Sequence, residues 1–357
     1  MPTRRKLLAG ALAAAVAPRV AWAEVGDPRF VTAALGADGR FRLCGLTAAG
    51  AIAFEQNMPG RGHAAASHPV IAEAVVFARR PGTFALVLNC ATGQVVAELT
   101  APPSRHFYGH GAYSRDGALL YTTENDLETL EGRIGIWDTR QYLRVGEIAS
   151  GGIGPHDMRR MPGTDTLVVA NGGIATHPDS GRAKLNLPTM RANLAYVSAT
   201  DGILDLVEVP VEMQLNSLRH LDVGSDGLVA AAFQWQGDAV DAPPLLALHR
   251  RGAPLEFLEA DPLTHRRLDG YAGSVAFSGD GARVAITSPR GGLLQSFTID
   301  GHRPSMTLSA EDICGVAPGG PGFMYTTGLG HVGWTDTDDK IAHDGLQFDN
   351  HLIALRG

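Results

Sequence analysis

A repeated group of short strands restricts the fold of this chain more than any other feature of its sequence. From about residue 60 onward, strand-sized segments rich in β-branched and aromatic residues return at similar intervals. They span residues 74–78, 119–123, 166–170, 228–232, 283–287 and 323–327. Further segments of this kind follow some of them, at residues 134–138, 194–197 and 245–248. The sequence therefore predicts an all-β protein made of similar units.

Asp-Gly dipeptides mark the turns inside several of these units. They stand at Asp116-Gly117, Asp226-Gly227 and Asp280-Gly281, each between two apolar segments. Asp-Gly between apolar runs indicates a tight hairpin, because glycine adopts the positive φ that such a turn requires. Neighbouring segments are thus expected to pair as antiparallel strands.

A multi-stranded repeat of about 40 to 50 residues is typical of a β-propeller blade. Division of residues 24–357 among seven blades gives about 48 residues for each, so seven blades fit best, and six or eight stay open. We expect one propeller domain over residues 24–357. Residues 346–355 are too few for a blade, and we predict that they pair with a strand from residues 30–46 to close the ring.

The first 23 residues have the composition of an export signal. Arg4, Arg5 and Lys6 precede an apolar segment over residues 7–17, and Ala21-Trp22-Ala23 forms a small-residue cleavage pattern. The arginine pair favours the twin-arginine pathway over an ordinary export signal with two chance arginines. We therefore expect residues 1–23 to be a signal peptide and the mature chain to lie in the periplasm, with no stable membrane insertion after cleavage.

Charge and cysteine content exclude several classes of protein. The formal net charge is −7, and loss of residues 1–23 makes it −11, because that segment holds four basic residues and no acidic one. An acidic chain is unsuited to nucleic acid. Covalent haem is excluded because no Cys-x-x-Cys-His motif occurs. The three cysteines, Cys44, Cys90 and Cys314, allow at most one internal disulfide. Signatures of nucleophilic hydrolases, zinc proteases and nucleotide-binding loops are missing from the sequence.

Four histidines occur in register with the repeat. His63, His110, His156 and His220 each stand at the expected start of the first strand of a blade, 47, 46 and 64 residues apart. First strands line the central channel of a propeller, so residues at the same strand position converge there. Neutral imidazole is a ligand for zinc, copper, iron and nickel. The four residues therefore predict a transition-metal site, against the alternative that each imidazole only hydrogen-bonds neighbouring backbone.

Two further residues share this register. Cys314 stands at the corresponding position of a later unit, and His351 lies on the last strand. Both are weaker metal-ligand candidates, and Cys314 has the simpler interpretation of a small buried apolar residue.

A long insertion follows the third of these units. Residues 171–187 are too many for a plain hairpin, and the segment combines glycines with His177, Asp179, Arg182 and Lys184. Long loops on rigid scaffolds often carry function. We interpret this loop as a lid over one mouth of the channel, with these four residues as candidate cofactor-binding groups.

Several motifs of the chain resemble a bacterial exported family known as domain of unknown function 1513. They lie at residues 108–111, 114–117, 123–126, 152–156, 170–174, 176–179, 181–187 and 288–292. The resemblance extends over nearly the whole mature chain and is most specific over residues 156–187. It implies a seven-bladed propeller of the YVTN and quinoprotein-like superfamily. It also implies association with imelysin-like periplasmic proteins of iron uptake, beside which such members are encoded, and it implies no activity.

Three functions are compatible with these observations. The first is binding of iron or copper in the channel by His63, His110, His156 and His220, as an accessory to metal uptake. The second is a metal-dependent oxidoreductase on a propeller scaffold. The third is a protein-interaction scaffold with no small ligand. We expect the first, and we expect the chain not to be an enzyme of a well-known hydrolytic or nucleotide-dependent type.

Overall fold

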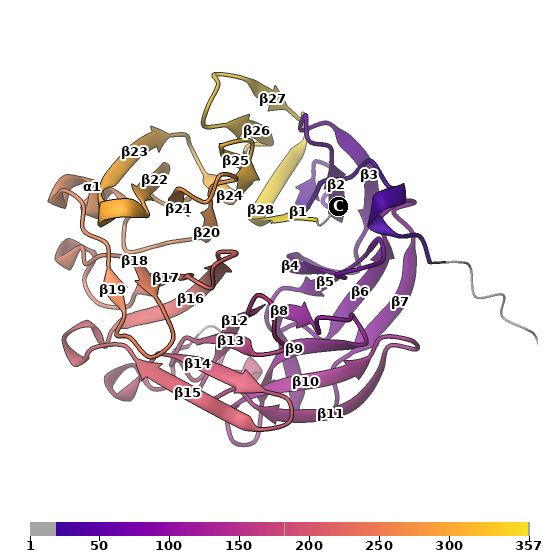
Figure 1. The fold of residues 1–357 in the computed structure, drawn as a ribbon, viewed down its shortest axis with the longest axis horizontal. Coiled ribbons are helices and arrows are strands. Elements are labelled where there is room, and N and C mark those ends of the chain that lie inside the picture. The colour runs from indigo at the N-terminus through magenta and orange to yellow at the C-terminus, as the bar shows by residue number, and fades with distance from the viewer. Residues whose placement is uncertain (1–18, 182, 356–357) are drawn as a thin grey trace, which may run out of the picture.

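The computed structural model describes residues 19–181 and 183–355, and these form seven four-stranded antiparallel sheets arranged as a ring (Figure 1). The chain is thus a seven-bladed β-propeller, as the repeat predicted. Within the described residues, no helix is long and apolar enough to cross a membrane.

Six blades follow the chain in order, from the strand at the channel to the strand at the rim. Their bounds are β4 (Gly62–Ser67), β5 (Glu73–Ala78), β6 (Phe84–Asn89) and β7 (Val95–Thr100); β8 (Arg105–Tyr113), β9 (Leu119–Asp126), β10 (Gly132–Asp138) and β11 (Leu143–Ala149); β12 (Pro155–Arg160), β13 (Leu167–Asn171), β14 (Asn193–Ser198) and β15 (Gly202–Glu208); β16 (Asn216–Val223), β17 (Val229–Trp235), β18 (Leu246–His249) and β19 (Glu256–Phe257); β20 (Ser274–Phe277), β21 (Arg283–Ser288), β22 (Leu293–Thr298) and β23 (Pro304–Ser309); β24 (Ile313–Gly319), β25 (Gly322–Thr327), β26 (His331–Trp334) and β27 (Lys340–Ala342).

The seventh blade joins the two ends of the chain. Its strands are β28 (Leu346–Ala354) at the channel, then β1 (Phe30–Gly36), β2 (Phe41–Leu46) and β3 (Ile52–Asn57). β28 pairs antiparallel with β1, from Phe30 opposite Ala354 to Gly36 opposite Leu346. The predicted closure is therefore present, and it leaves the ring without an open edge between its first and last blades.

The predicted turns and strands agree with this arrangement. Asp116-Gly117 connects β8 to β9, Asp226-Gly227 connects β16 to β17, and Asp280-Gly281 connects β20 to β21. The glycine of each pair has a φ between 70° and 81°. The second strands expected from the sequence coincide with β5, β9, β13, β17, β21 and β25 within one to three residues at their ends.

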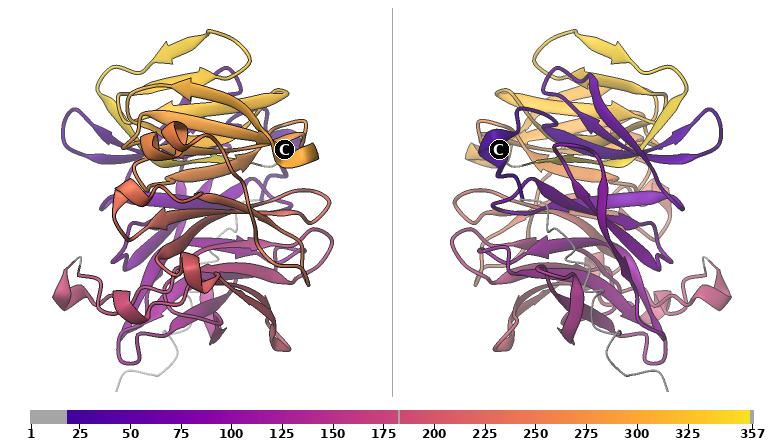
Figure 2. Two further views of the ribbon diagram at one scale, coloured as in Figure 1. Left: turned by 90° about the vertical axis from the view of Figure 1, so that its left-hand side faces the viewer. Right: turned by 90° about the vertical axis from the view of Figure 1, so that its right-hand side faces the viewer.

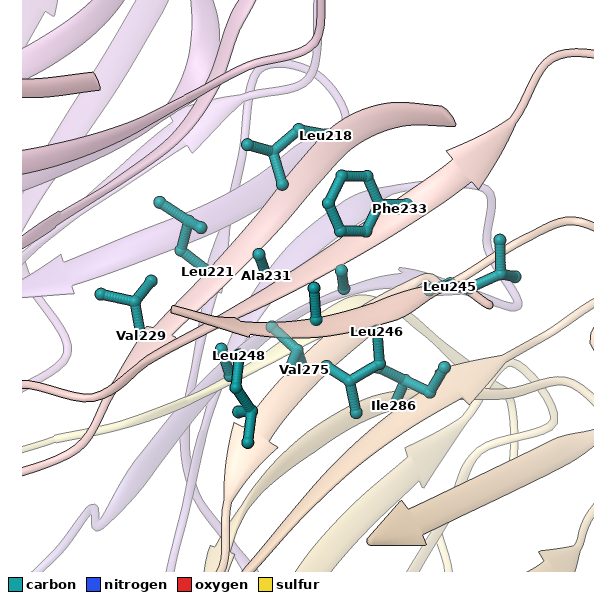
Figure 3. Packing of buried hydrophobic residues seen from close by; sticks show 14 of the residues in the cluster. Leu218, Leu221, Val229, Ala231, Phe233, Leu245, Leu246, Leu248, Val275 and Ile286 are labelled. Carbon is teal, nitrogen blue, oxygen red and sulfur yellow. The ribbon is translucent and has the colours of Figure 1, made fainter. Parts of the chain in front are cut away.

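Apolar side chains fill the spaces between neighbouring blades. Figure 3 shows one such contact, where Leu246 and Leu248 of β18 lie toward Val275 and Ile286 of the next blade, while Phe233 of β17 lies beside Leu218 on the other side of the same sheet. Phe233 and Ile286 are fully buried. At about 25 cal/mol per Å² of buried apolar surface, contacts of this kind hold one blade against the next and fix the inner strands around the channel.

Five residues of the predicted signal segment, residues 19–23, are part of the described structure. Residues 19–24 lie against the outside of the blade that begins with β4, and Trp22 of the 3₁₀ helix η1 (Trp22–Glu24) is 5% exposed. Its indole Nε1 donates a hydrogen bond to the carbonyl of His68 at 2.6 Å. If the chain is cleaved after Ala23, these contacts belong to the uncleaved form alone. Residues 1–18, which hold the predicted twin-arginine motif, lie outside the described residues.

All three cysteines are buried and free. Burial raises the pKa of each thiol to about 12, so the thiol is the form of each cysteine at neutral pH.

Candidate metal centre

Irregularities in the inner strands turn histidine side chains toward the centre of the ring. The pairing of an inner strand with its second strand shifts register at His63 in β4, at His110 in β8 and at His156 in β12. A similar shift lies beside His220 in β16 and beside His351 in β28. A β-bulge bends its strand and changes the direction of a side chain. The five inner strands thus direct five imidazoles toward one another at the centre of the ring.

The five rings form one compact cluster. The ring centre of His63 is 4.5 Å from that of His351 and 5.0 Å from that of His110. His156 is 4.8 Å from His220. His351 in turn is 4.8 Å from both His110 and His220. The structure therefore brings together all four histidines that the sequence singled out for the metal and adds His351, the weaker candidate of the last strand.

Six ring nitrogens in this cluster are buried and have no hydrogen-bond partner among the described residues. They are Nδ1 of His63, Nε2 of His110, Nδ1 of His156, both nitrogens of His220 and Nε2 of His351. A buried polar atom without a partner costs about 1 to 3 kcal/mol, and native structures hold few of them. A bound ion removes this cost because each lone pair then has an acceptor orbital.

The ligand atoms meet in two groups that share His110. His63, His110 and His156 form one group, and His110, His220 and His351 form the other, with the ligand atoms of each group within 4.8 Å of one another. Three nitrogens spaced evenly in a plane around one ion at about 2.1 Å lie about 3.6 Å from one another. Where three ligand atoms are as much as 4.8 Å apart, each must move by about 0.7 Å to reach that arrangement.

Four imidazoles of the cluster, those of His63, His156, His220 and His351, are held in their uncharged form. Burial and the neighbouring rings His351 and His110 lower the pKa of His63 well below its ordinary value. Burial and the neighbouring ring of His220 lower the pKa of His156 in the same way. Burial and the ring of His110 lower the pKa of His351. The pKa of His220 falls to about 3, again mainly through burial. The lone pairs of these four imidazoles are therefore free of protons at neutral pH, as metal coordination requires.

Asp157 orients one of the imidazoles. His110 donates through Nδ1 to Asp157 Oδ1 at 2.8 Å, and both side chains are 1% exposed. In the neutral ring this bond makes Nε2 the lone-pair nitrogen of His110, and Nε2 is buried without a partner among the described residues. Burial raises the pKa of Asp157, but Arg159 and His110 outweigh it and lower the pKa overall, so the group is a carboxylate. A carboxylate behind a ligating histidine is common at metal sites.

Asp157 also connects two blades. Its Oδ2 accepts the backbone N–H of Leu221 in the next blade at 2.9 Å, and its Oδ1 accepts the N–H of Met158 at 2.7 Å. Sequence reasoning missed this residue, although its position directly after a channel histidine could have indicated it.

Glycine is required beside His110. Gly109 has a φ of 105°, and a Cβ atom at this position would lie 2.5 Å from Cδ2 of His63. Any other residue would push the imidazole of the neighbouring blade away, so the Tyr-Gly-His sequence at residues 108–110 is a packing requirement of the cluster.

The other inner-strand candidates lie outside the cluster. Cys314 is buried on β24, where its Sγ contacts the carbonyl oxygens of Thr326 and Phe348 at 3.5 Å. It takes part in neither of the two ligand groups. Ser274, which shares the register on β20, is also buried.

The insertion after β13 projects from one face of the ring (Figure 2). Asn186 ties its two ends together, since Oδ1 accepts from Ala175 N at 2.7 Å and Nδ2 donates to Gly173 O at 2.8 Å. Asn125 of β9 holds the loop to the neighbouring blade through a bond to Thr176 O at 3.1 Å.

The four candidate cofactor-binding residues of this loop have different positions. Lys184 lines the cavity at the mouth of the channel, together with Pro178 and Gly181. His177 caps the 3₁₀ helix η2 (Pro178–Ser180) and lies 3.6 Å from Asp179, which points to solvent with 89% of its side chain exposed. Arg182 lies outside the described residues. The structure thus places only Lys184 of these residues at the channel.

The comparisons with known proteins give a family for the sequence and similar solved structures for the fold. The sequence matches the family described as "Protein of unknown function (DUF1513)" over residues 56–355. The chain belongs to this family. No curated protein matches the sequence.

A solved structure entitled "Kuenenia stuttgartiensis Hydrazine Synthase" is similar over 90% of this chain and 97% of that chain, with a TM-score of 0.61 and 13% sequence identity. In all, 1125 chains of solved structures are similar, so the likeness reflects a widespread architecture. Function in DUF1513 must therefore be argued from the site.

Proposed function

We propose that this protein binds a transition-metal ion, such as iron or copper, with the five channel imidazoles. The observation that carries the proposal is the convergence of five imidazoles that together hold six buried ring nitrogens with no partner among the described residues. A set of nitrogen ligands suits copper, iron, nickel and zinc. His110, which belongs to both ligand groups, is the central ligand.

The low pKa values of His63, His156, His220 and His351 support this role. Each group is uncharged throughout the range in which an exposed histidine would take up a proton. The ion thus meets no proton competition from them above pH 6.

We also propose that the metal is bound in the periplasm and that the protein is an accessory to iron or metal uptake. Imelysin-like proteins would be its partners. The export signal over residues 1–23 and the motifs of DUF1513 support this location. Fractionation of cells that express the full chain tests the location, because an exported form appears in the periplasmic fraction without residues 1–23.

Metal quantification by mass spectrometry tests the central proposal. Protein purified from its own cellular compartment should hold about one equivalent of one transition metal, because His110 belongs to both ligand groups and offers one free nitrogen. His110→Ala should lose most of it. His249→Ala is the matched control, because His249 is equally buried but bonds Tyr196 and Ala253 outside the cluster. Equal metal content in both variants would contradict the proposal.

A further inference from the structure

A cavity at one mouth of the channel opens directly onto the imidazole cluster. It has a volume of about 610 Å³, and His63, His156 and His220 form part of its wall. Six basic residues line the remainder, and no acidic one does among the described residues: Arg61, Arg79, Arg80, Lys184, Arg219 and Arg290. This cavity is called the mouth cavity below.

Arg219 is the buried member of this group. It precedes His220 at the bulge of β16 and is only 9% exposed. Its Nε has no partner among the described residues. Its guanidinium is a cation at neutral pH. A buried cation without a counter-ion is costly, and an anion in the mouth cavity would remove that cost.

The neighbours of Arg219 do not supply the missing charge. Within the described residues, none of Arg80, Lys184, Arg219 and Arg290 forms an ion pair with a carboxylate. Arg80 donates to Thr176 Oγ1 at 3.2 Å, and the guanidinium of Arg290 lies 4.5 Å from the ring centre of Tyr271. Burial, Arg219 and Arg290 lower the pKa of Lys184, which shows that these cations repel one another.

The carboxylate of Asp349 is already shared between two arginines that line the mouth cavity. Asp349 lies 2.5 Å from Arg61 and 3.9 Å from Arg79. It thus compensates at most one of the two positive charges on its own side and none of those around Arg219.

A bare metal ion would increase this excess of positive charge. The imidazoles contribute no charge, and the carboxylate of Asp157 lies 3.7 Å from Arg159, which offsets it. An ion held in the cluster is therefore expected to carry an anionic ligand on the side that faces the mouth cavity. A volume of about 610 Å³ lies within the range of small-molecule sites and exceeds what a single inorganic oxyanion fills.

We propose that the mouth cavity binds a small organic polycarboxylate, with carboxylates on Arg219, Arg80 and Lys184 and another directed to the ion in the imidazole cluster. Contact with the ion rests on the proposed function. Contact with the basic residues does not, and it should occur in metal-free protein.

Isothermal titration of the full chain with tricarballylate, a tricarboxylate, tests this proposal. The neutral triamide of the same acid serves as the uncharged probe. We expect tricarballylate to bind the metal-free protein, the triamide not to bind, and the affinity to fall as salt rises from 50 to 500 mM. Loading with one equivalent of Cu²⁺ should raise the affinity at least tenfold.

Two variants identify the residues involved. Arg219→Gln and Lys184→Gln should each weaken binding by about tenfold to a hundredfold, the usual loss for one charge-assisted contact. Lys340→Gln, on the outer strand β27, is the control for the lysine. Arg140→Gln is the control for the arginine, because Arg140 is exposed on the surface and pairs there with Asp138. Lys184 is exposed in a loop, so its variant keeps the test valid should Arg219→Gln fail to fold.

The outcomes separate the two proposals. Binding of tricarballylate without any metal binding would support the polycarboxylate site and contradict the metal centre. Metal binding without tricarballylate binding would support the metal centre and contradict the polycarboxylate site. Equal affinity in wild type, Arg219→Gln and Lys184→Gln would overturn the site, and equal affinity for inorganic phosphate would overturn its assignment to polycarboxylates.

Discussion

Replacement of Asp157 by asparagine should weaken metal binding without removing any imidazole. The carboxylate accepts three N–H groups, from His110, Met158 and Leu221. An amide at this position presents an N–H₂ group to one of these donors. Rotation that brings this group to His110 makes Nδ1 the acceptor and moves the ring proton to Nε2, the atom that faces the cluster.

The loss of metal affinity can be estimated from the one bond between Asp157 and His110. Loss of a partner behind a ligating histidine lowers metal affinity by about 10- to 100-fold, which is about 1.4 to 2.8 kcal/mol. Loss of charge-assisted bonds to buried N–H groups should also lower the free energy of unfolding by about 1 to 3 kcal/mol in metal-free protein.

Competition titration of Cu²⁺ against a chelator of known affinity measures the first effect, and urea denaturation measures the second. Asp222→Asn is the matched control, because Asp222 also joins two blades, through a bond to Phe277 N at 2.8 Å, and has no bond to a channel imidazole. The control should lose stability and keep metal affinity. Unchanged metal affinity in Asp157→Asn, with both variants destabilised alike, would refute the role given to Asp157.

Three further predictions concern the closure, the pH dependence and the N-terminal contact. A chain that ends at Gly345 lacks β28, so it should melt without a cooperative transition in scanning calorimetry, and a sharp transition at the wild-type temperature would contradict this. Burial lowers the pKa of His68 to about 4, so the unfolded chain binds a proton between about pH 6.5 and 4 that the folded chain does not. The free energy of unfolding should therefore fall over this range as pH decreases. His68→Asn should reduce the total loss by up to about 3 kcal/mol in urea denaturation, whereas an unaltered loss would exclude His68 as its source. Trp22→Ala in the uncleaved chain should cost about 3 kcal/mol of unfolding free energy, and a loss below about 0.5 kcal/mol would show that the indole contact contributes little to the fold.

Local sequence signals were sufficient to predict the strands and turns of the blades. Apolar segments of five residues and Asp-Gly turns specify a strand and its neighbour directly, because both are short-range features of the chain. The number of blades and the pairing of the last strand with β1 followed from the length of the repeat and from the need to avoid an open edge.

The composition of the cluster could be predicted only in part. His63, His110, His156 and His220 repeat at the same place in consecutive units, whereas His351 lies on a strand whose partner β1 is about 320 residues away. Asp157 and Arg219 owe their positions to bulges, each of which shifts the direction of side chains by one residue. A bulge leaves no sequence signal as plain as a turn, so the depth of these residues in the channel was not predictable.

The position of β28 has a consequence for the order of events during synthesis. The last strand of the chain is also the innermost strand of its blade and holds His351. Until β28 has left the ribosome, the growing chain can form six blades and can present four imidazoles, but it has neither a closed ring nor the fifth ligand. Closure of the ring and completion of the site therefore depend on the same late segment, and a chain that terminates before Leu346 yields an incomplete ring that also lacks His351.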